Sequence, residues 1–349
     1  MPRTDDPRAD DPRVLATSLA LARNDAVLPF PNAAGDDDLE GLFARVEEML
    51  AHLGVPGEWQ VSRLDDLRES TRWYLVEKGL MTPSFSRGGG SGRGFAVYRG
   101  STVSLEINGG SHLRILGARV GDGLAELWST IDSLDDAFES DLRYAFDERW
   151  GYLAARPNEA GTGMRAYVTL HLPGLMITGR LGSIAVQLIS EGLVLHPLWE
   201  GAGGLFQVSN RGGLGISEER TVEMVRSASL KIAEKEQAVR AMFLREDPLR
   251  AHDYIGRALG VAQHARSVGI EEALGLVSAM MVGSEMGLFD QPLTVPEAFL
   301  LMRDLHPGHL AIEHAPADGE DPGEDDLDHM RADLLRERFA EFRLQDRRG

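Results

Sequence analysis

Two glycines and an arginine near the middle of the chain have the types and spacing of an anion-binding loop. Gly161, Thr162 and Gly163 are consecutive, and Arg165 follows two residues later. Glycines let backbone N–H groups come close to an anion, and a guanidinium beside them can bind a phosphate through two parallel hydrogen bonds. A β-turn with a surface arginine would have the same sequence, so this short motif alone leaves both interpretations open.

The loop is followed by a segment with the pattern of a β-strand. Small or polar residues alternate with apolar ones from Ala166 to Leu172, and Pro173-Gly174 then interrupts the pattern. Alternation with a period of two predicts a strand, and the Pro-Gly pair predicts its end. We therefore expect Arg165 to lie between the glycine loop and the strand.

The longer stretch around this loop, residues 150–175, resembles the ATP:guanido phosphotransferases and, within them, the bacterial protein-arginine kinases. That family carries a segment close to G-Y-L-T-S-C-P-T-N-x-G-T-G-L-R-A-S-V-x-x-H-L-P. The residues that match it in register are Gly151, Tyr152, Leu153, Pro157, Gly161, Thr162, Gly163, Arg165, Ala166, Val168, His171, Leu172 and Pro173. The family's cysteine falls on Arg156.

The resemblance implies an α+β fold. We expect a guanido-kinase (glutamine-synthetase-like) catalytic domain, in which helices flank an antiparallel sheet, followed by a C-terminal all-helical domain of the protein-arginine-kinase type. The expected boundaries are a disordered tail over residues 1–13, the catalytic domain over 14–246 and the helical domain over 247–349. Active relatives transfer the γ-phosphate of Mg-ATP to an arginine of a protein.

The carboxylates that this resemblance implies are missing. The segment from Asn108 to Arg114 stands where the family has N-E-E-D-H-L-R, but Gly109 and Gly110 replace both glutamates and Ser111 replaces the aspartate. A guanidinium has a pKa above about 12 and is no nucleophile until a positioned base accepts its proton. Glycine supplies neither a base nor a clamp, so catalysis by the family's route is in doubt.

Most of the phosphate-binding arginines that the resemblance implies are missing too. Of five, Arg114 and Arg165 remain, while Ser18, Ala20 and His196 replace the others. Each lost charge-assisted contact is worth roughly 1.5–3 kcal/mol, so three losses would cost about three to six powers of ten in affinity if additive. The family's histidine is kept as His112, which we count with His196 among the candidate nucleotide-contacting residues.

Two functional hypotheses follow. The first is a pseudokinase with a regulatory or protein-binding role, which needs no cofactor. The second is an active protein-arginine kinase that uses Mg-ATP, with Glu200, or Asp147 and Glu148, as a relocated base. A pocket repurposed for another small anion is a third, less favoured hypothesis.

The C-terminal part also carries a candidate site. The R-D-x-x-R-A phosphoarginine pocket of the protein-arginine kinases falls on residues 327–332, where Asp328 and Arg331 match but Leu327 replaces the leading arginine. A plain surface helix is the simpler interpretation. The resemblance suggests phosphoarginine-tagged proteins, an active paralogue or a Clp-type unfoldase as partners, and a possible homodimer.

Helical spacing and capping signals predict the surrounding elements. Apolar residues recur every three or four positions over residues 37–53, 64–80 and 121–138. Ser217 is a candidate N-cap of a long helix, and Thr294 with Glu297 forms a capping-box pattern. The pattern also predicts paired strands at 95–98 and 102–107. The glycine-rich residues 86–94 indicate a flexible hairpin loop, because no Lys-Ser or Lys-Thr follows as in a phosphate cradle.

Composition narrows the functional class. The net charge of −19 argues against non-specific binding to nucleic acid or anionic membranes, which requires basic patches. The chain has no cysteine, which excludes disulfides and thiolate metal sites, and the residues suggest no other metal site. No run of about 18 apolar residues and no apolar leader is present, so we expect a cytoplasmic protein.

Overall fold

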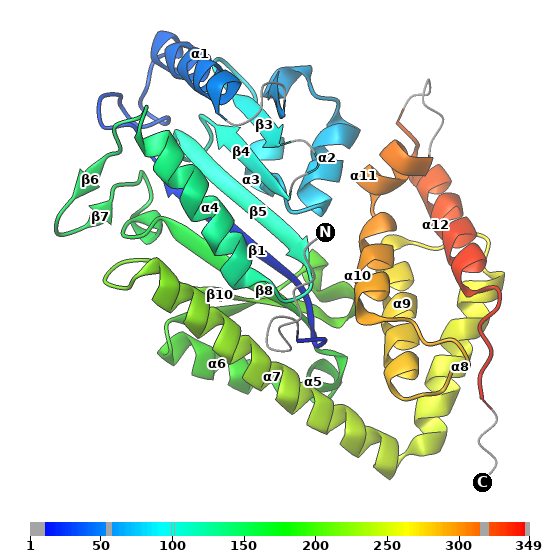
Figure 1. Cartoon of the computed structure of the whole chain (residues 1–349). Coiled ribbons are helices and arrows are strands. Elements are labelled where there is room, and N and C mark those ends of the chain that lie inside the picture. Colours follow the sequence, from blue (N-terminus) through cyan, green and yellow to red (C-terminus); the bar gives the residue numbers. More distant parts are fainter. Residues whose placement is uncertain (1–10, 54–57, 99, 101, 315–320, 346–349) are drawn as a thin grey trace.

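A computed structural model describes residues 11–53, 58–98, 100, 102–314 and 321–345. Most of the tail expected over residues 1–13 lies outside the described residues, and the first strand begins at Val14. Figure 1 shows a broad sheet with long helices across one face, next to a separate group of helices formed by the C-terminal third of the chain.

The sheet has eight strands in the order β2-β3-β4-β5-β1-β8-β10-β9, and every neighbouring pair is antiparallel. A small hairpin of β6 and β7 stands apart from it. The strands are β1 (Val14–Arg23), β2 (Trp59–Arg63), β3 (Gly94–Tyr98), β4 (Val103–Ile107), β5 (Leu113–Val120), β6 (Phe146–Asp147), β7 (Gly151–Tyr152), β8 (Met164–His171), β9 (Leu193–Pro197) and β10 (Leu205–Asn210).

Three helices cover one face of this sheet: α4 (Leu124–Glu139), α6 (Leu181–Ser190) and α7 (Glu218–Glu246). Alternate strand residues point toward them and are fully buried, as a strand period of two requires. Gly117 on β5 permits the close approach of α4, because a Cβ there would lie 2.6 Å from Leu127 Cδ1. The main hydrophobic core of the sheet-containing part therefore lies between this face and the helices.

Shorter helices cover only one end of the opposite face. They are α2 (Glu69–Glu77) and α3 (Pro83–Ser86), and their small core consists of Leu64, Met81, Phe85 and Phe95. Helix α1 (Asp36–His52) adds Leu42, Phe43 and Val46 to the main core on the helix-covered side, and α5 (Pro173–Ile177) lies against α7. The middle of this second face carries polar side chains, which are described below.

Within the described residues, the C-terminal part consists of helices joined by turns and loops, with a single β-bridge between Phe289 and Leu344. Asp247 separates α7 from the next helix and caps it, because its side chain accepts a hydrogen bond from the backbone N–H of Arg250 at 3.1 Å. The helices are α8 (Pro248–His264), α9 (Ile270–Glu285), α10 (Val295–Asp304), α11 (Pro307–His309) and α12 (Glu324–Phe339), with a π-helical turn at Leu310–His314. The α+β fold with a helical C-terminal part is thus confirmed.

The two parts contact each other through specific polar and aromatic groups. The carboxylate of Glu77 on α2 accepts hydrogen bonds from the backbone N–H groups of Gly308 and His309, at 2.7 and 2.8 Å. Just after β9, Trp199 stacks on Phe299 of α10. The centroids of the Trp199 and His306 rings are 4.2 Å apart. The two Trp199 contacts hold the turn Trp199–Gly204 against the helical part.

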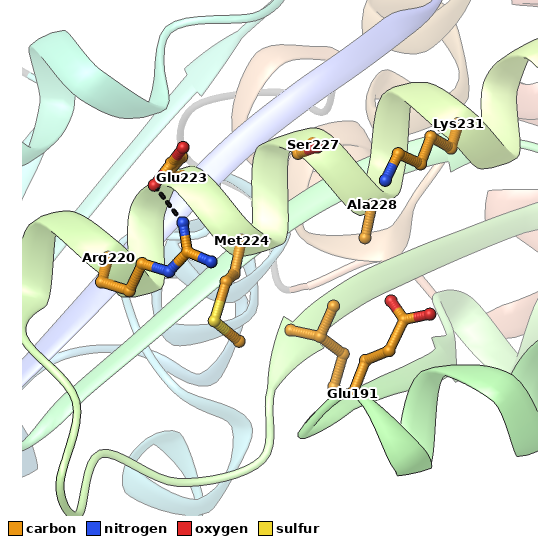
Figure 2. Close-up of a pocket in the computed structure, with 8 residues that line it drawn as sticks. Glu191, Arg220, Glu223, Met224, Ser227, Ala228 and Lys231 are labelled. Carbon is orange, nitrogen blue, oxygen red and sulfur yellow. Dashed lines mark hydrogen bonds and ion pairs between the residues drawn. The ribbon is translucent and has the colours of Figure 1, made fainter.

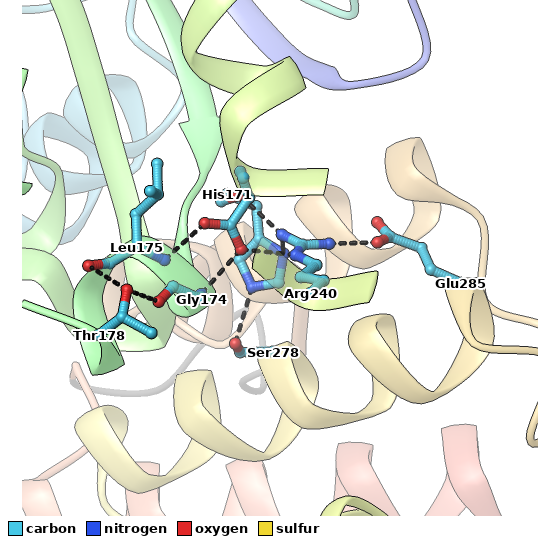
Figure 3. Close-up of polar contacts among 8 residues, drawn as sticks. His171, Gly174, Leu175, Thr178, Arg240, Ser278 and Glu285 are labelled. Atoms are coloured by element: carbon cyan, nitrogen blue, oxygen red, sulfur yellow. Dashed lines mark hydrogen bonds and ion pairs between the residues drawn. The ribbon is translucent and has the colours of Figure 1, made fainter. Parts of the chain in front are cut away.

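A third contact is a buried network at the end of β8 (Figure 3). His171 lies between Arg240 of α7, whose Nη2 donates to its Nδ1 at 3.0 Å, and Ser278 of α9, whose Oγ lies 2.7 Å from its Nε2. Because Nδ1 accepts a hydrogen bond, the proton is on Nε2 and is donated to Ser278. His171 therefore cannot deprotonate the serine, and the network joins the two parts rather than forming a nucleophilic pair.

Two local expectations from the sequence were wrong. The helix expected over 64–80 is a 3₁₀ turn (Leu64–Asp66) followed by α2, because Leu67 and Arg68 between them are extended. The glycine-rich loop is no hairpin, since it follows α3 and packs on α1. A Cβ on Gly92 would lie 2.4 Å from Leu39 O, and Asn108 Nδ2 donates to the carbonyl oxygens of both residues.

None of the helices in the described ranges is both long and apolar enough to cross a bilayer.

Candidate ligand-binding site

The strand register brings the candidate phosphate-binding positions onto one face of the sheet. Ala20 on β1 is paired with Arg165 on β8, and Ala22 is paired with Arg114 on β5. Residues that are directly paired across an antiparallel ladder project to the same side. Ser18, two residues before Ala20, shares that side. This is the face opposite α4, α6 and α7, and we call it the open face.

Arg165 is the guanidinium at the centre of the open face. Its Nη1 donates to the backbone carbonyl oxygen of Asn210 at 2.5 Å, so the chain itself already uses one end of the group. His196 on β9 lies near enough to Arg165 for the positive charge of the guanidinium to affect the pKa of the imidazole. Burial and then this cation lower the pKa of His196, which is neutral at pH 7 and adds no positive charge.

Arg114 is the second guanidinium, and carboxylates surround it. Its Nη2 donates to Glu159 Oε1 at 3.0 Å, and its Nε lies 3.8 Å from Glu106 Oε2. Arg156, at the place of the family's cysteine, reaches the same Glu159 oxygen at 3.5 Å. The positive charge of Arg114 is therefore largely compensated within the chain.

A pocket of about 310 Å³ opens beside Arg114. Its lining residues come from β4, β5, α3 and the loops around them: Pro31, Asn32, Thr82, Ser84, Phe85, Arg93, Glu106, Gly109, Gly110, Arg114, Ala155 and Arg156. We call this cavity the acceptor pocket, because Gly109 and Gly110 mark it as the place where the resemblance puts the substrate carboxylates. The sequence-predicted residues Arg114, Gly109 and Gly110 do come together here.

The two glycines differ in what they could accommodate. A Cβ on Gly109 would lie 2.9 Å from the buried Phe85 ring, so a longer side chain there requires the ring to move. The nearest atom to a Cβ on Gly110 is Arg114 Nη2, at 3.6 Å, which is an ordinary contact. Only Gly110 could therefore regain a carboxylate without rearrangement.

Glu106 lines the acceptor pocket and is a candidate functional residue that the sequence motifs did not indicate. The residue is only 1% exposed, and its Oε1 accepts a hydrogen bond from the backbone N–H of Thr82 at 2.6 Å. Burial raises the pKa of Glu106 to about 7, although Thr82 and Arg114 act in the opposite direction. The available signal was a glutamate inside a predicted strand, two residues before Asn108, where an apolar residue would be ordinary.

His112 does not take part in this pocket. Its ring is buried, its Nδ1 accepts a hydrogen bond from the backbone N–H of Asp25, and the backbone N–H of His112 donates to Asn24 Oδ1. Burial lowers the pKa of His112, which favours the neutral ring. The residue holds the end of β1 against the segment before β5.

The carboxylates considered as relocated bases lie elsewhere. Glu200 is exposed on the Trp199–Gly204 turn, where its φ is 60°, and this turn packs against α9. Asp147 and Glu148 are exposed around the β6–β7 hairpin. None of the three is among the described residues that line the acceptor pocket.

The expected phosphoarginine site in the helical part has little free donor capacity. Arg331 is only 3% exposed, its Nε donates to the carbonyl oxygen of Leu305 at 2.9 Å, and its Nη1 donates to Asp328 at 2.5 Å. Burial lowers the pKa of Arg331. The bond to Leu305 ties α12 to the C-terminal end of α10, and the bond to Asp328 lies within α12. A ligand would have to displace these partners.

A second groove, of about 270 Å³, lies on the helix-covered side, between α7 and the start of β9 (Figure 2). Arg220 there is paired with Glu223 on the same helix, and Lys231 and Glu191 contribute opposite charges. The groove does not communicate with the open face, since the sheet lies between them. We therefore assign no site to it.

Comparison with known proteins agrees with this geometry. Residues 42–239 match the family model of the ATP:guanido phosphotransferase C-terminal catalytic domain, and residues 248–349 match that of the protein-arginine kinase McsB C-terminal domain. A protein-arginine kinase of Halothermothrix orenii is 33% identical over 332 residues, which cover 93% of this chain and 93% of the relative. The chain belongs to the protein-arginine kinase family.

A second relative agrees with this family, and a solved structure agrees with the fold. A protein-arginine kinase of Moorella thermoacetica is 35% identical over 287 residues, covering 80% of this chain and 81% of the relative. The crystal structure of a lombricine kinase superposes with a TM-score of 0.58 at 20% identity, covering 66% of this chain and 68% of the other. At that identity the structural match bears on the fold alone.

The family uses ATP, but the open face of this chain is a poor fit for a triphosphate. Of the two guanidiniums that match the family's phosphate-binding arginines, Arg165 is hydrogen-bonded to Asn210 and Arg114 to Glu159. Ala20 and Ser18, the next positions along β1, offer a methyl group and a hydroxyl. A triphosphate carries several negative charges that need charged donors, and these residues supply few of them.

Proposed function

We propose that this protein-arginine kinase family member has lost phosphoryl transfer and binds arginine side chains of a protein partner in a regulatory role. The observation that carries the proposal is the pairing of Ala20 with Arg165, with Ser18 alongside, on the face where the family binds nucleotide phosphates. The absence of carboxylates at Gly109 and Gly110 supports the same proposal, because neither position supplies a general base that could accept the guanidinium proton.

The Trp199–Gly204 turn supports the proposal as well. By resemblance, it stands where active relatives have a glycine-rich loop that closes over the phosphates. Here Trp199 is stacked on Phe299, and a Cβ on Gly203 would lie 2.9 Å from the carbonyl oxygen of Leu274 on α9. A turn anchored to the helical part in this way is restrained from closing over the open face.

The identity of the partner is proposed from the family resemblance alone. Candidates are an unfolded protein with accessible arginines, a phosphoarginine-tagged protein, an active paralogue and a Clp-type unfoldase. Homodimerisation and a cytoplasmic location belong to the same proposal. The strongly acidic chain, with a net charge of −19, suits a basic partner.

The test is binding in the presence and absence of nucleotide. The purified chain is mixed with an arginine-rich unfolded protein, with and without Mg-ATP, and complex formation is measured by calorimetry. We expect a complex whose affinity does not depend on Mg-ATP. A complex that forms only with Mg-ATP would contradict the proposal, because it would mean that the open face still binds nucleotide.

One observation favours a second candidate, an active kinase. Glu106 lies in the acceptor pocket with its pKa raised to about 7, which is the range of a useful general base. In that case Mg-ATP-dependent phosphorylation of arginine would be abolished by Glu106→Gln. The same reaction abolished by Glu200→Gln would instead favour the base expected from the sequence.

A further inference from the structure

A cavity of about 420 Å³ lies at the seam between the sheet-containing part and the helical part. Five segments line it, which are the residues just before β1, the end of β8, α7, the end of α9 and the start of α10. We call it the seam cavity. Its volume is in the range of small-molecule pockets, about 300–1,000 Å³, and is too small for a folded partner.

The inner wall of the seam cavity is apolar. Leu170 at the end of β8, Ala233 on α7 and Met281 on α9 are buried, and Met286 and Val295 are half-buried beside them. Apolar atoms that border a cavity lack van der Waals partners on one side, and an apolar group that enters the cavity supplies these partners and leaves water. The inner wall therefore suits an apolar side chain.

Two charged groups of the seam cavity are already engaged by the chain itself. Glu236 accepts hydrogen bonds from two backbone N–H groups at the start of α5, each at 2.7 Å, and from Arg240 Nε at 2.6 Å. Arg240 also donates through Nη1 to Glu285 and through Nη2 to the ring and the carbonyl oxygen of His171 (Figure 3). Glu236 and Arg240 thus hold α7 in place and are not available to a ligand.

Two other charged groups of the lining, of opposite sign, each have a free end. Arg13 donates to Asp11 through Nε and Nη2, at 2.8 and 2.5 Å, but its Nη1 makes no hydrogen bond within the described part of the chain, where Glu234 Oε1 lies 3.8 Å away. Glu285 accepts from Arg240 through Oε2, while its Oε1 has no donor among the described residues. The two side chains are 30% and 38% exposed, which places them at the mouth of the cavity.

We propose that the seam cavity binds a free α-amino acid with an apolar side chain. Arg13 Nη1 donates to the carboxylate of the ligand, Glu285 Oε1 accepts from its ammonium group, and its side chain lies against the apolar inner wall. A ligand with only one charge leaves the other group at the mouth without a partner. A zwitterion with an apolar side chain is therefore the chemical class that matches the whole cavity.

Such a ligand contacts both parts of the chain. Leu170 and Ala233 belong to the sheet-containing part, and Met281 and Glu285 belong to the helical part. A molecule that binds only the folded chain stabilises it by mass action, so the melting temperature rises with the ligand concentration. None of the described residues that line the seam cavity lines the acceptor pocket, so this inference goes beyond the proposed function and does not depend on phosphoryl transfer.

The test is calorimetric titration of the full chain with L-leucine. The comparison ligands are leucinamide, which lacks the carboxylate, N-acetyl-L-leucine, which lacks the ammonium group, and L-arginine, which lacks an apolar side chain. The variants are Arg13→Gln and Glu285→Gln, and the matched control is Arg257→Gln, which changes an exposed arginine on α8. Glutamine at 285 still offers an acceptor to Arg240. Thermal melting without ligand checks that each variant folds, and the comparison ligands are tested on the parent chain.

We expect L-leucine to bind and to raise the melting temperature, and each of the other three ligands to bind at least about tenfold more weakly. Arg13→Gln and Glu285→Gln should each weaken leucine binding by at least about tenfold, and Arg257→Gln should leave it unchanged. Absence of leucine binding by the parent chain would overturn the proposal. Equal binding of leucinamide or N-acetyl-L-leucine, preferred binding of L-arginine, or equal leucine binding by the parent and both glutamine variants would overturn it as well.

Discussion

Arg165 on β8 lies directly opposite Ala20 on β1, so a guanidinium kept from the family's phosphate site has a methyl group as its cross-strand neighbour. By resemblance, an active relative has a second arginine at the position of Ala20 and a third at Ser18. The backbone ladder is continuous through this region, so the sheet is intact while the charge is missing. Because the sheet is intact, we expect that arginines introduced on β1 can supply the missing charge without a change of fold.

Restoring both arginines should restore nucleotide binding. The double variant Ser18→Arg/Ala20→Arg places two guanidiniums on the open face beside Arg165. Each new charge-assisted contact is worth about 1.5–3 kcal/mol, so the dissociation constant for Mg-ATP should fall at least about tenfold. Isothermal calorimetry measures it directly.

The control for that variant adds the same charge elsewhere. Val186 and Ile189 on α6 are 70% and 50% exposed, and Val186→Arg/Ile189→Arg should leave Mg-ATP affinity unchanged. Equal gains in both double variants would mean that net charge, rather than the geometry of the open face, limits binding.

Glu106 makes stability depend on pH in a defined window. Its pKa is raised from 4.5 to about 7 in the folded chain, so between these values the native state holds a proton that the unfolded state has released. Stability therefore falls as pH rises through this window and stays lower above it. Glu106→Gln should match the parent at pH 5 and exceed it at pH 8, by up to about 3 kcal/mol, in urea unfolding.

The control variant is Glu191→Gln. Its difference from the parent in free energy of unfolding should be the same at pH 5 and pH 8. A Glu106→Gln difference that does not change between pH 5 and pH 8 would mean that Glu106 is not held neutral by its surroundings.

The buried network between β8, α7 and α9 should be sensitive to loss of one hydroxyl. Ser278→Ala leaves the His171 Nε2–H without its acceptor, and an unsatisfied buried donor costs about 1–3 kcal/mol. Denaturant unfolding measures the loss. Ser133→Ala, which removes an exposed hydroxyl on α4, should change stability by no more than about 0.5 kcal/mol. Equal effects of the two substitutions would exclude a special role for the network.

Trp199 is expected to hold its turn in place. Trp199→Ala removes the stacking on Phe299 and the contact with His306, so amide hydrogen exchange over 199–204 should accelerate. Trp150→Ala in the β6–β7 region should leave exchange at 199–204 unchanged. Unaltered exchange in the Trp199 variant would mean that other contacts, such as that of Gly203 with α9, fix the turn.

Much of the fold could be predicted from local patterns. The alternation over 166–172 identified β8, and the spacing over 37–53 and 121–138 identified α1 and α4. Capping signals were equally informative. Ser217 accepts a hydrogen bond from the backbone N–H of Arg220, and Thr294 forms its capping box with Glu297. These features depend on neighbours within a few residues, which the sequence displays directly.

The site was harder to predict because it depends on contacts between distant segments. Burial of Glu106 results from α3 packing over β4, and the approach of Glu159 to Arg114 joins residues 45 positions apart. The engagement of Arg331 with Leu305 likewise depends on how α12 packs. Residue type alone indicated which of the family's groups this chain lacks, but not which of its own side chains lie near Arg114.

The most direct test of the proposed loss of phosphoryl transfer is a phosphotransfer assay on the unmodified chain. The protein is incubated with Mg-ATP and an arginine-rich unfolded protein, and phosphoarginine is sought by mass spectrometry without acid steps, since the P–N bond is acid-labile. An active protein-arginine kinase serves as the control. We expect no phosphoarginine in the substrate protein while the control kinase modifies it. Modification that disappears in an Arg165→Ala variant would contradict the proposed loss of phosphoryl transfer.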